Sequence, residues 1–142
     1  MKEYVLNCKS TVKASNELTR KAVDILSERI DDSDVLYELK LLLSEACSNV
    51  VLHSYPQEEA GKLEVRIRFF PGRHIEIVVI NWGDVFEWPS LDSLDPVPEE
   101  ESGRGIYIIS KLADDFTYTR QGNQNILILR KNIEESLWKN CN

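Results

Sequence analysis

Residues 45–53 read Glu-Ala-Cys-Ser-Asn-Val-Val-Leu-His and place a carboxylate, an amide and an imidazole at intervals of four residues. Side chains four positions apart lie one above the other on a helix, so Glu45, Asn49 and His53 would form a polar stripe. Beside the stripe, apolar residues repeat at helical spacing: Leu39, Leu42, Leu43, Ala46 and Val50. The pattern predicts an amphipathic helix whose polar stripe is either a solvated face or a ligand site, and other segments have to decide between the two.

The polar residue types of the stripe suit chemistry on phosphates. A carboxylate such as Glu45 can orient or deprotonate a nucleophile. The amide oxygen of Asn49, one turn on, is a hard ligand of the kind that Mg²⁺ accepts while it keeps several waters and its nucleotide phosphates. His53 also has a simpler interpretation, because the helix dipole favours a histidine at a helix C-terminus.

Two glycine-bearing stretches lie further along the chain. Residues 78–86, Val-Val-Ile-Asn-Trp-Gly-Asp-Val-Phe, form a strand-like apolar run that ends in a polar residue and a glycine, where the backbone can turn tightly. Residues 103–109, Gly-Arg-Gly-Ile-Tyr-Ile-Ile, place two glycines at the entrance of an apolar helical pattern. Free backbone N–H groups and the helix dipole favour an anion there, and phosphate is the obvious one.

In this order, the three segments resemble the motifs of the GHKL ATPase superfamily, which has the Bergerat ATP-binding fold, and within it those of the bacterial anti-sigma-factor serine/threonine kinases. The N box corresponds to residues 43–55, the first glycine box to residues 81–89 and the second to residues 102–109. The resemblance covers roughly residues 10 to 130, and three ordered motifs are far more specific than any one of them.

The resemblance implies a role for each matching residue of the first two boxes. Asn49 would hold Mg²⁺ against the nucleotide phosphates, and Glu45 would act as general base toward the hydroxyl of a protein substrate. His53 would lie near the phosphates or the lid. Gly83 would let adenine approach the backbone.

By the same resemblance, the second glycine box would bind the phosphates. Gly103 and Gly105 would wrap them at the start of the next helix. Arg104, between the two glycines, would either add a cation or be a solvated side chain at a loop tip. Phe86 and Ile106 complete the cofactor-binding residues that the boxes imply.

The chain departs from the family pattern at Asn81, where the family usually has an aspartate that accepts a hydrogen bond from the adenine amino group. The carbonyl oxygen of an asparagine can still accept that bond. Replacing a charge-assisted bond by a neutral one costs about 1 kcal/mol, roughly fivefold in affinity. A flipped amide would instead donate to a guanine carbonyl, which we regard as the minority alternative. A second departure lies at residues 122–125, where the family often has a threonine.

The resemblance implies an anti-sigma factor that binds ATP and Mg²⁺ and acts as a serine/threonine protein kinase. Its substrate would be a small antagonist (anti-anti-sigma) protein in a partner-switching system of transcription regulation, and a sigma factor would be a second partner. The reaction would be phosphoryl transfer, in which Mg²⁺ neutralises developing charge and Glu45 positions or deprotonates the acceptor hydroxyl.

Two alternatives stay open. The first is a nucleotide-sensing module that binds a regulator with little or no kinase activity, which Asn81 allows and the retention of both N-box polar residues disfavours. The second is a homodimeric interaction domain that no longer binds nucleotide. Related domains often dimerise through N-terminal elements, so Tyr4, Leu6 and Leu18 are candidates for a homodimer interface, with an ordinary core or edge role equally open.

The composition fits one domain spanning residues 1–142, with 42% hydrophobic residues for a single core. The net charge of −7, from 24 acidic and 17 basic residues, argues against nucleic-acid binding. The apolar runs are strand-sized and the N-terminus has no hydrophobic signal region, so we expect no membrane association and a cytoplasmic location. Cys8, Cys47 and Cys141 are widely spaced, which suits reduced thiols, and Cys47 is expected to fill space in the core.

The expected fold is an α/β (α+β) two-layer sandwich in which a mixed, mostly antiparallel sheet carries the helices on one face. The expected strands are residues 4–8, 63–69, 74–80, 116–119 and 126–130, and the expected helices are residues 15–29, 34–53 and 104–112. Ser33 or Asp34 would cap the second helix, and residues 71–73, Pro-Gly-Arg, would turn the central hairpin. Residues 84–102, with several prolines and acidic residues, would form the ATP lid.

Overall fold

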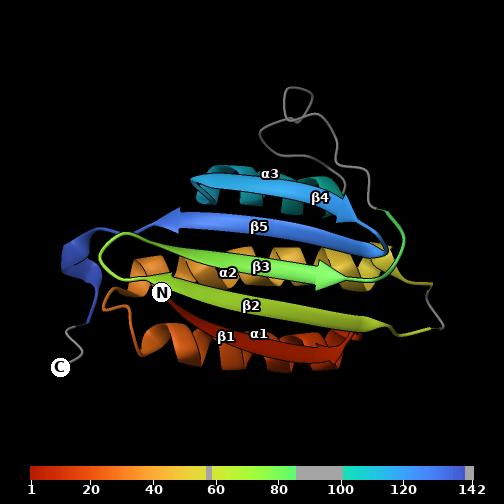
Figure 1. Ribbon diagram of the computed structural model, residues 1–142, viewed down its shortest axis with the longest axis horizontal. Helices are drawn as coiled ribbons and strands as arrows, with labels where there is room; N and C mark the ends of the chain where they lie inside the picture. The colour runs from red at the N-terminus through yellow and green to blue at the C-terminus, as the bar shows by residue number, and fades with distance from the viewer. Residues whose placement is uncertain (57–58, 86–100, 140–142) are drawn as a thin grey trace.

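The computed structural model describes residues 1–56, 59–85 and 101–139. In these residues a five-stranded sheet carries the α-helices on one face (Figure 1). The strands are β1 (Lys2–Lys9), β2 (Lys62–Phe70), β3 (His74–Asn81), β4 (Asp115–Gln121) and β5 (Gln124–Asn132). The helical elements are α1 (Val12–Ser27), α2 (Ser33–Asn49), the π-helical turn η1 (Val50–Ser54), α3 (Glu101–Leu112) and the 3₁₀ turn η3 (Glu135–Leu137).

The strands lie in the order β1-β2-β3-β5-β4, and every neighbouring pair is antiparallel. The two-layer sandwich is therefore confirmed, but the described sheet is antiparallel throughout rather than mixed. The reason lies in the last hairpin. Strand β4 runs parallel to β3, yet β5 turns back and inserts between the two, so no two parallel strands become neighbours.

The core forms between α1, α2 and the inner face of the sheet. Alternate residues of β2 are fully buried, as the period of a strand with one covered face requires. The apolar stripe predicted for α2 is also confirmed, since all its members are at most 4% exposed: Leu39, Leu42, Leu43, Ala46 and Val50. Leu18 is 3% exposed within this core, so the ordinary core role, one of the two left open for it, is the one observed. Tyr4 and Leu6 pack partly against the same core.

Helix α2 begins one residue earlier than expected, and Asp32 caps it. The backbone of Asp32 is extended, and its Oδ2 accepts a hydrogen bond of 3.0 Å from the backbone N–H of Val35. Ser33 is already helical, so the prediction of Ser33 or Asp34 as the cap is wrong. Any of three adjacent polar residues satisfies the capping preference, and only the backbone conformation selects among them.

Replacing the Asp32 cap tests this boundary. Asp32→Ala should lower the free energy of unfolding by about 1 kcal/mol, because the N–H of Val35 loses its acceptor. Ser33→Ala, the matched control, should change it by less than about 0.5 kcal/mol. Urea denaturation of both variants measures the difference, and a larger loss in Ser33→Ala would contradict the assignment.

The α-helical part of the N-box helix ends at Asn49 and not at His53. Residues Val50–Ser54 continue as a π-helical turn, whose hydrogen bonds span five residues instead of four. His53 therefore lies in the π-helical turn and not in the α-helix that carries Glu45 and Asn49, and its side chain is exposed.

The central hairpin turns as predicted, with Gly72 in the left-handed region at φ 76°. Helix α3 starts at Glu101, three residues before the predicted start. The predicted lid, residues 84–102, lies mostly outside the described residues, as does Phe86. Among the described helices, none has the length and apolar character needed to cross a bilayer.

Candidate functional site

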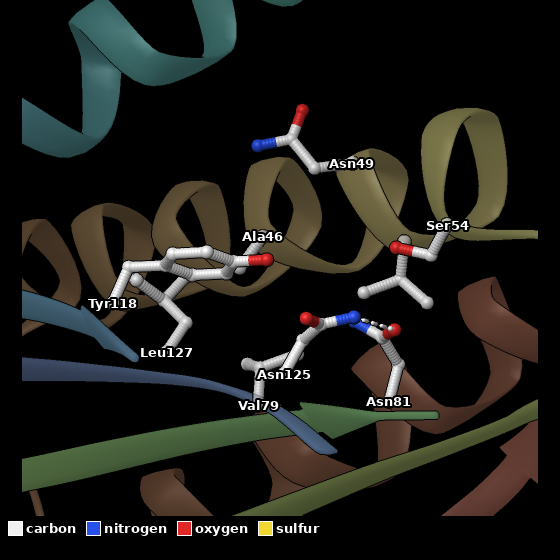
Figure 2. Close-up of a pocket in the computed structure, with 9 residues that line it drawn as sticks. Ala46, Asn49, Ser54, Val79, Asn81, Tyr118, Asn125 and Leu127 are labelled. Carbon is white, nitrogen blue, oxygen red and sulfur yellow. Dashed lines mark hydrogen bonds between the residues drawn. The ribbon is translucent and has the colours of Figure 1, made fainter. Parts of the chain in front are cut away.

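A pocket opens between α2 and the inner face of the sheet, where β3 and β5 meet (Figure 2). Its lining combines apolar side chains with polar ones from segments far apart in the chain. The lining residues are Ala46, Asn49, Val50, Ser54, Val79, Asn81, Tyr118, Asn125 and Leu127. An apolar pocket with a few converging polar groups is the usual form of a small-molecule site.

The second glycine box lies against Glu45 and Asn49. A Cβ at Gly105 would lie 2.6 Å from Oε2 of Glu45 and 3.8 Å from Oδ1 of Asn49. A larger residue at this position would require the Glu45 carboxylate to shift, so glycine suits the close packing of α3 over these side chains. The structure brings together the carboxylate, the amide and the glycine box that the sequence placed some 55 residues apart.

Asn49 projects from α2 on the side that faces α3 (Figure 2). Its Nδ2 is buried and has no hydrogen-bond partner among the described residues. Leaving a buried amide donor unpaired costs about 1–3 kcal/mol, so such a group usually marks a place built for a ligand, a water or an ion.

Asn81 stands at the end of β3 and is 5% exposed. Its Oδ1 accepts two hydrogen bonds, one of 2.9 Å from the backbone N–H of Gly83 and one of 2.8 Å from Nδ2 of Asn125. The first is the local bond that asparagine commonly makes to the backbone two residues on. The oxygen expected to accept from adenine is thus already engaged by donors of the protein.

Asn125 is a pocket residue that the sequence analysis did not single out. It pairs directly with Asn81 across β3 and β5, and it is 1% exposed. Its Nδ2 also lies 3.2 Å from the carbonyl oxygen of Gly83 and 3.0 Å from that of Asp84, and its Oδ1 accepts from Arg120 at 3.0 Å. The alternation along β5 indicates this residue, because Asn125 is a polar residue at a position that faces the core.

Gly83 has a packing reason to be glycine that differs from the expected one. The position of its missing Cβ is taken by the carbonyl group of Ser54, whose carbon would lie 2.6 Å away. The same carbonyl accepts a 2.7 Å hydrogen bond from the N–H of Asp84, and the N–H of Trp82 donates to the Tyr55 hydroxyl. The first glycine box is thereby fixed to the end of the π-helical turn.

The remaining predicted residues lie in or near α3. Gly103 and Arg104 fall inside its first turn instead of before it, because the helix begins at Glu101. The two glycines of the box thus lie in the first turn of α3 and just beyond it, and their contact with phosphates stays a prediction. Ile106 belongs to α3 and is 1% exposed.

Cys47 fills space in the core, as predicted, and is fully buried. The pKa of its thiol is raised from the ordinary 9.0 to about 12, first because of burial and second because of the neighbouring Cys8, while hydrogen bonds with Thr19 and Ser15 act in the opposite direction. Because the pKa of Cys47 is raised in the folded state, the contribution of its protonated thiol to the free energy of unfolding is fully present below pH 9. It is lost between pH 9 and 12, since only the unfolded chain releases the proton there.

We therefore expect Cys47 to add alkali sensitivity to the chain. Above pH 9 it should lower the free energy of unfolding by up to about 1.4 kcal/mol per pH unit. Urea denaturation at pH 8 and pH 10.5 measures this slope in the wild type and in Cys47→Ala. The variant should show the shallower slope, and equal slopes would contradict the assignment.

Comparison with known proteins agrees with this geometry. A model of the histidine kinase-like ATPase domain matches residues 8–131. The chain is 33% identical to the serine-protein kinase RsbW of Bacillus velezensis over 90 residues, which is 58% of this chain and 56% of that protein. It is 30% identical to the RsbW of Bacillus thuringiensis over 105 residues, which is 68% of this chain and 64% of that protein. The matches thus span between half and two thirds of the length of these relatives.

Solved structures with low sequence identity share the fold. The RsbU and RsbW domains of a Mycobacterium tuberculosis protein superpose with a TM-score of 0.68 at 14% identity, over 92% of this chain and 32% of that one. The histidine kinase domain of the blue-light activated histidine kinase from Erythrobacter litoralis gives a TM-score of 0.55 at 17% identity, over 87% of this chain and 62% of that one. The family match includes the N box and both glycine boxes. The chain therefore belongs to the family of histidine kinase-like ATPase domains.

Proposed function

We propose that this chain binds a magnesium–nucleoside triphosphate, ATP in the simplest case, and transfers its γ-phosphoryl group to a serine or threonine of a small antagonist protein. In this account it is a cytoplasmic anti-sigma factor that exchanges a sigma factor for its antagonist. Support comes from the family, from relatives named serine-protein kinase, and from the site.

The observation that carries the proposal is the position of Gly105 directly against Glu45 and Asn49. Glu45 and Asn49, which we propose as the acid–base group and the metal ligand, lie on neighbouring turns of α2 against a segment whose sequence suits phosphates. The pocket beside them has an apolar floor and amide side chains, the kind of lining that a nucleotide base would require.

The residues present fit Mg²⁺. Mg²⁺ is typically held by one or two protein oxygens together with phosphate oxygens and waters, so the amide oxygen of Asn49 is a sufficient protein ligand. The Nδ2 of the same amide is buried and has no partner in the described part of the chain, which is consistent with a side chain fixed for a ligand rather than for the fold. The ion would supply charge neutralisation on the phosphates.

Glu45 would hold the acceptor hydroxyl in line with the γ-phosphorus and take its proton. The bond between the γ-phosphorus and the bridging oxygen breaks, the hydroxyl oxygen forms the new bond to phosphorus, and the nucleoside diphosphate leaves. The backbone around Gly103 and Gly105 would contact the phosphates, with Arg104 as a candidate cation.

The test is phosphoryl transfer by the purified chain. The small antagonist proteins of the same cell are expressed singly and incubated with the chain, Mg²⁺ and γ-labelled nucleotide. The proposal predicts label on a serine or threonine of one antagonist. Nucleotide binding without transfer to any antagonist would instead favour a nucleotide-sensing module, and absence of nucleotide binding would leave an interaction domain.

A further inference from the structure

We propose that the pocket recognises the carbonyl at position 6 of a purine, and so binds guanine or hypoxanthine nucleotides more tightly than adenine nucleotides. The inference rests on the proposed function and names the base class for the same site. It depends on which polar atom of Asn81 faces the ligand, and the hydrogen bonds around this residue determine that.

The orientation of the Asn81 amide is fixed by a group that can only donate. The backbone N–H of Gly83 points at one terminal atom of the side chain from 2.9 Å, so that atom has to be the oxygen. An amide flip would place two donors face to face in a buried position, where the cost of an unpaired group is highest.

The orientation of Asn125 is fixed independently, and it agrees. The carbonyl oxygens of Gly83 and Asp84, which can only accept, lie 3.2 Å and 3.0 Å from its Nδ2, and Arg120, which can only donate, lies 3.0 Å from its Oδ1. The nitrogen of Asn125 therefore donates to Asn81, as the dashed line in Figure 2 marks.

These bonds decide what Asn81 can offer to a base. Its oxygen already accepts two hydrogen bonds, one for each lone pair. Its Nδ2 donates no hydrogen bond to any residue in the described part of the chain, although Asn81 lines the pocket. The group left for a ligand is thus an N–H donor.

With position 6 of the purine toward Asn81, the placement that the family resemblance implies, a donor at this place selects against adenine. The exocyclic group of adenine at position 6 is itself an amino donor, whereas guanine and hypoxanthine carry a carbonyl acceptor there. Adenine would leave two donors opposed, and a 6-oxopurine would pair with the amide. An unpaired buried donor lowers affinity by roughly 10- to 100-fold.

The test is calorimetric titration of the full chain with magnesium complexes of ATP, ITP and GTP. The wild type should bind ITP and GTP about tenfold or more tightly than ATP. Asn81→Asp keeps the acceptor for Gly83 and Asn125 and presents an oxygen in place of the NH₂ group, so it should reverse the order. Asn7→Asp on β1 makes the same chemical change on an exposed residue and should keep the wild-type order.

Each result bears on the inference separately from the function. A wild type that prefers ATP, or an Asn81→Asp variant with unchanged preference, overturns the inference and leaves the proposed function standing. Tight GTP with weak ITP also overturns it, because recognition would then use the amino group at position 2. Binding of none of the three overturns both.

A second measurement does not depend on a variant that folds. In ¹⁵N–¹H spectra of the wild type, the side-chain NH₂ signals of Asn81 should move downfield when ITP is added and less when ATP is added. Signals of Asn81 that move equally with both nucleotides overturn the inference.

Discussion

Glu45→Gln is expected to slow phosphoryl transfer to the antagonist by about 10²- to 10⁴-fold, the usual contribution of a general base. Glutamine has nearly the size of glutamate, which matters because Gly105 packs closely here. A Cβ at Gly105 would lie only 2.6 Å from Oε2 of Glu45. The substitution removes the proton acceptor while it preserves the packing of α3. Single-turnover transfer from labelled nucleotide measures the rate, and calorimetry should show nucleotide affinity changed by less than about threefold.

The matched control is Glu38→Gln, which makes the same change two turns earlier on α2. Glu38 pairs with Lys131 at 2.7 Å and lies away from the pocket, so its loss should alter stability by less than about 1 kcal/mol and leave transfer unchanged. If Glu45→Gln and Glu38→Gln transfer at the same rate, Glu45 is not the base.

Gly83→Ala is expected to give the largest loss of stability among single-methyl changes at the site. The new Cβ would overlap the backbone carbonyl of Ser54, which also accepts from the N–H of Asp84 and cannot move aside without breaking that bond. We expect the free energy of unfolding to fall by about 2–3 kcal/mol, the range for overpacked sites. Urea denaturation measures it.

Gly122→Ala separates this overlap from backbone strain. Gly122 has a φ of 59° and nothing within 4 Å of its Cβ position, so alanine there meets only the cost of the left-handed conformation, about 1 kcal/mol. A Gly83→Ala variant no less stable than Gly122→Ala would show that the first glycine box is not clamped on Ser54.

The sequence predicted the parts of the fold that depend on periodicity. The apolar stripe of α2 and the alternation of β2 each repeat often enough to determine an element and its buried face. The Asp32 cap and the π-helical turn were missed because each depends on the conformation of one or two residues, which no repeat encodes.

For the candidate site, the sequence predicted the polar residues of α2 and both glycine boxes, since these lie within short segments. It could not assign the partners of Asn81. The bond to Asn125 joins residues 44 positions apart and exists only because the β3–β5 register sets them opposite one another. The contact of Gly83 with Ser54 was missed for the same reason, because it is tertiary, and the approach of adenine to Gly83 stays a prediction.

Magnesium-dependent nucleotide binding through Asn49 is the central claim, and one calorimetric series tests it most directly. The wild type and Asn49→Ala are titrated with ATP and with ITP, each in Mg²⁺ and in excess EDTA. The account predicts micromolar binding of at least one nucleotide to the wild type in Mg²⁺, weakened about tenfold or more both by EDTA and by the substitution. Absence of binding, or binding that neither EDTA nor Asn49→Ala alters, would contradict it.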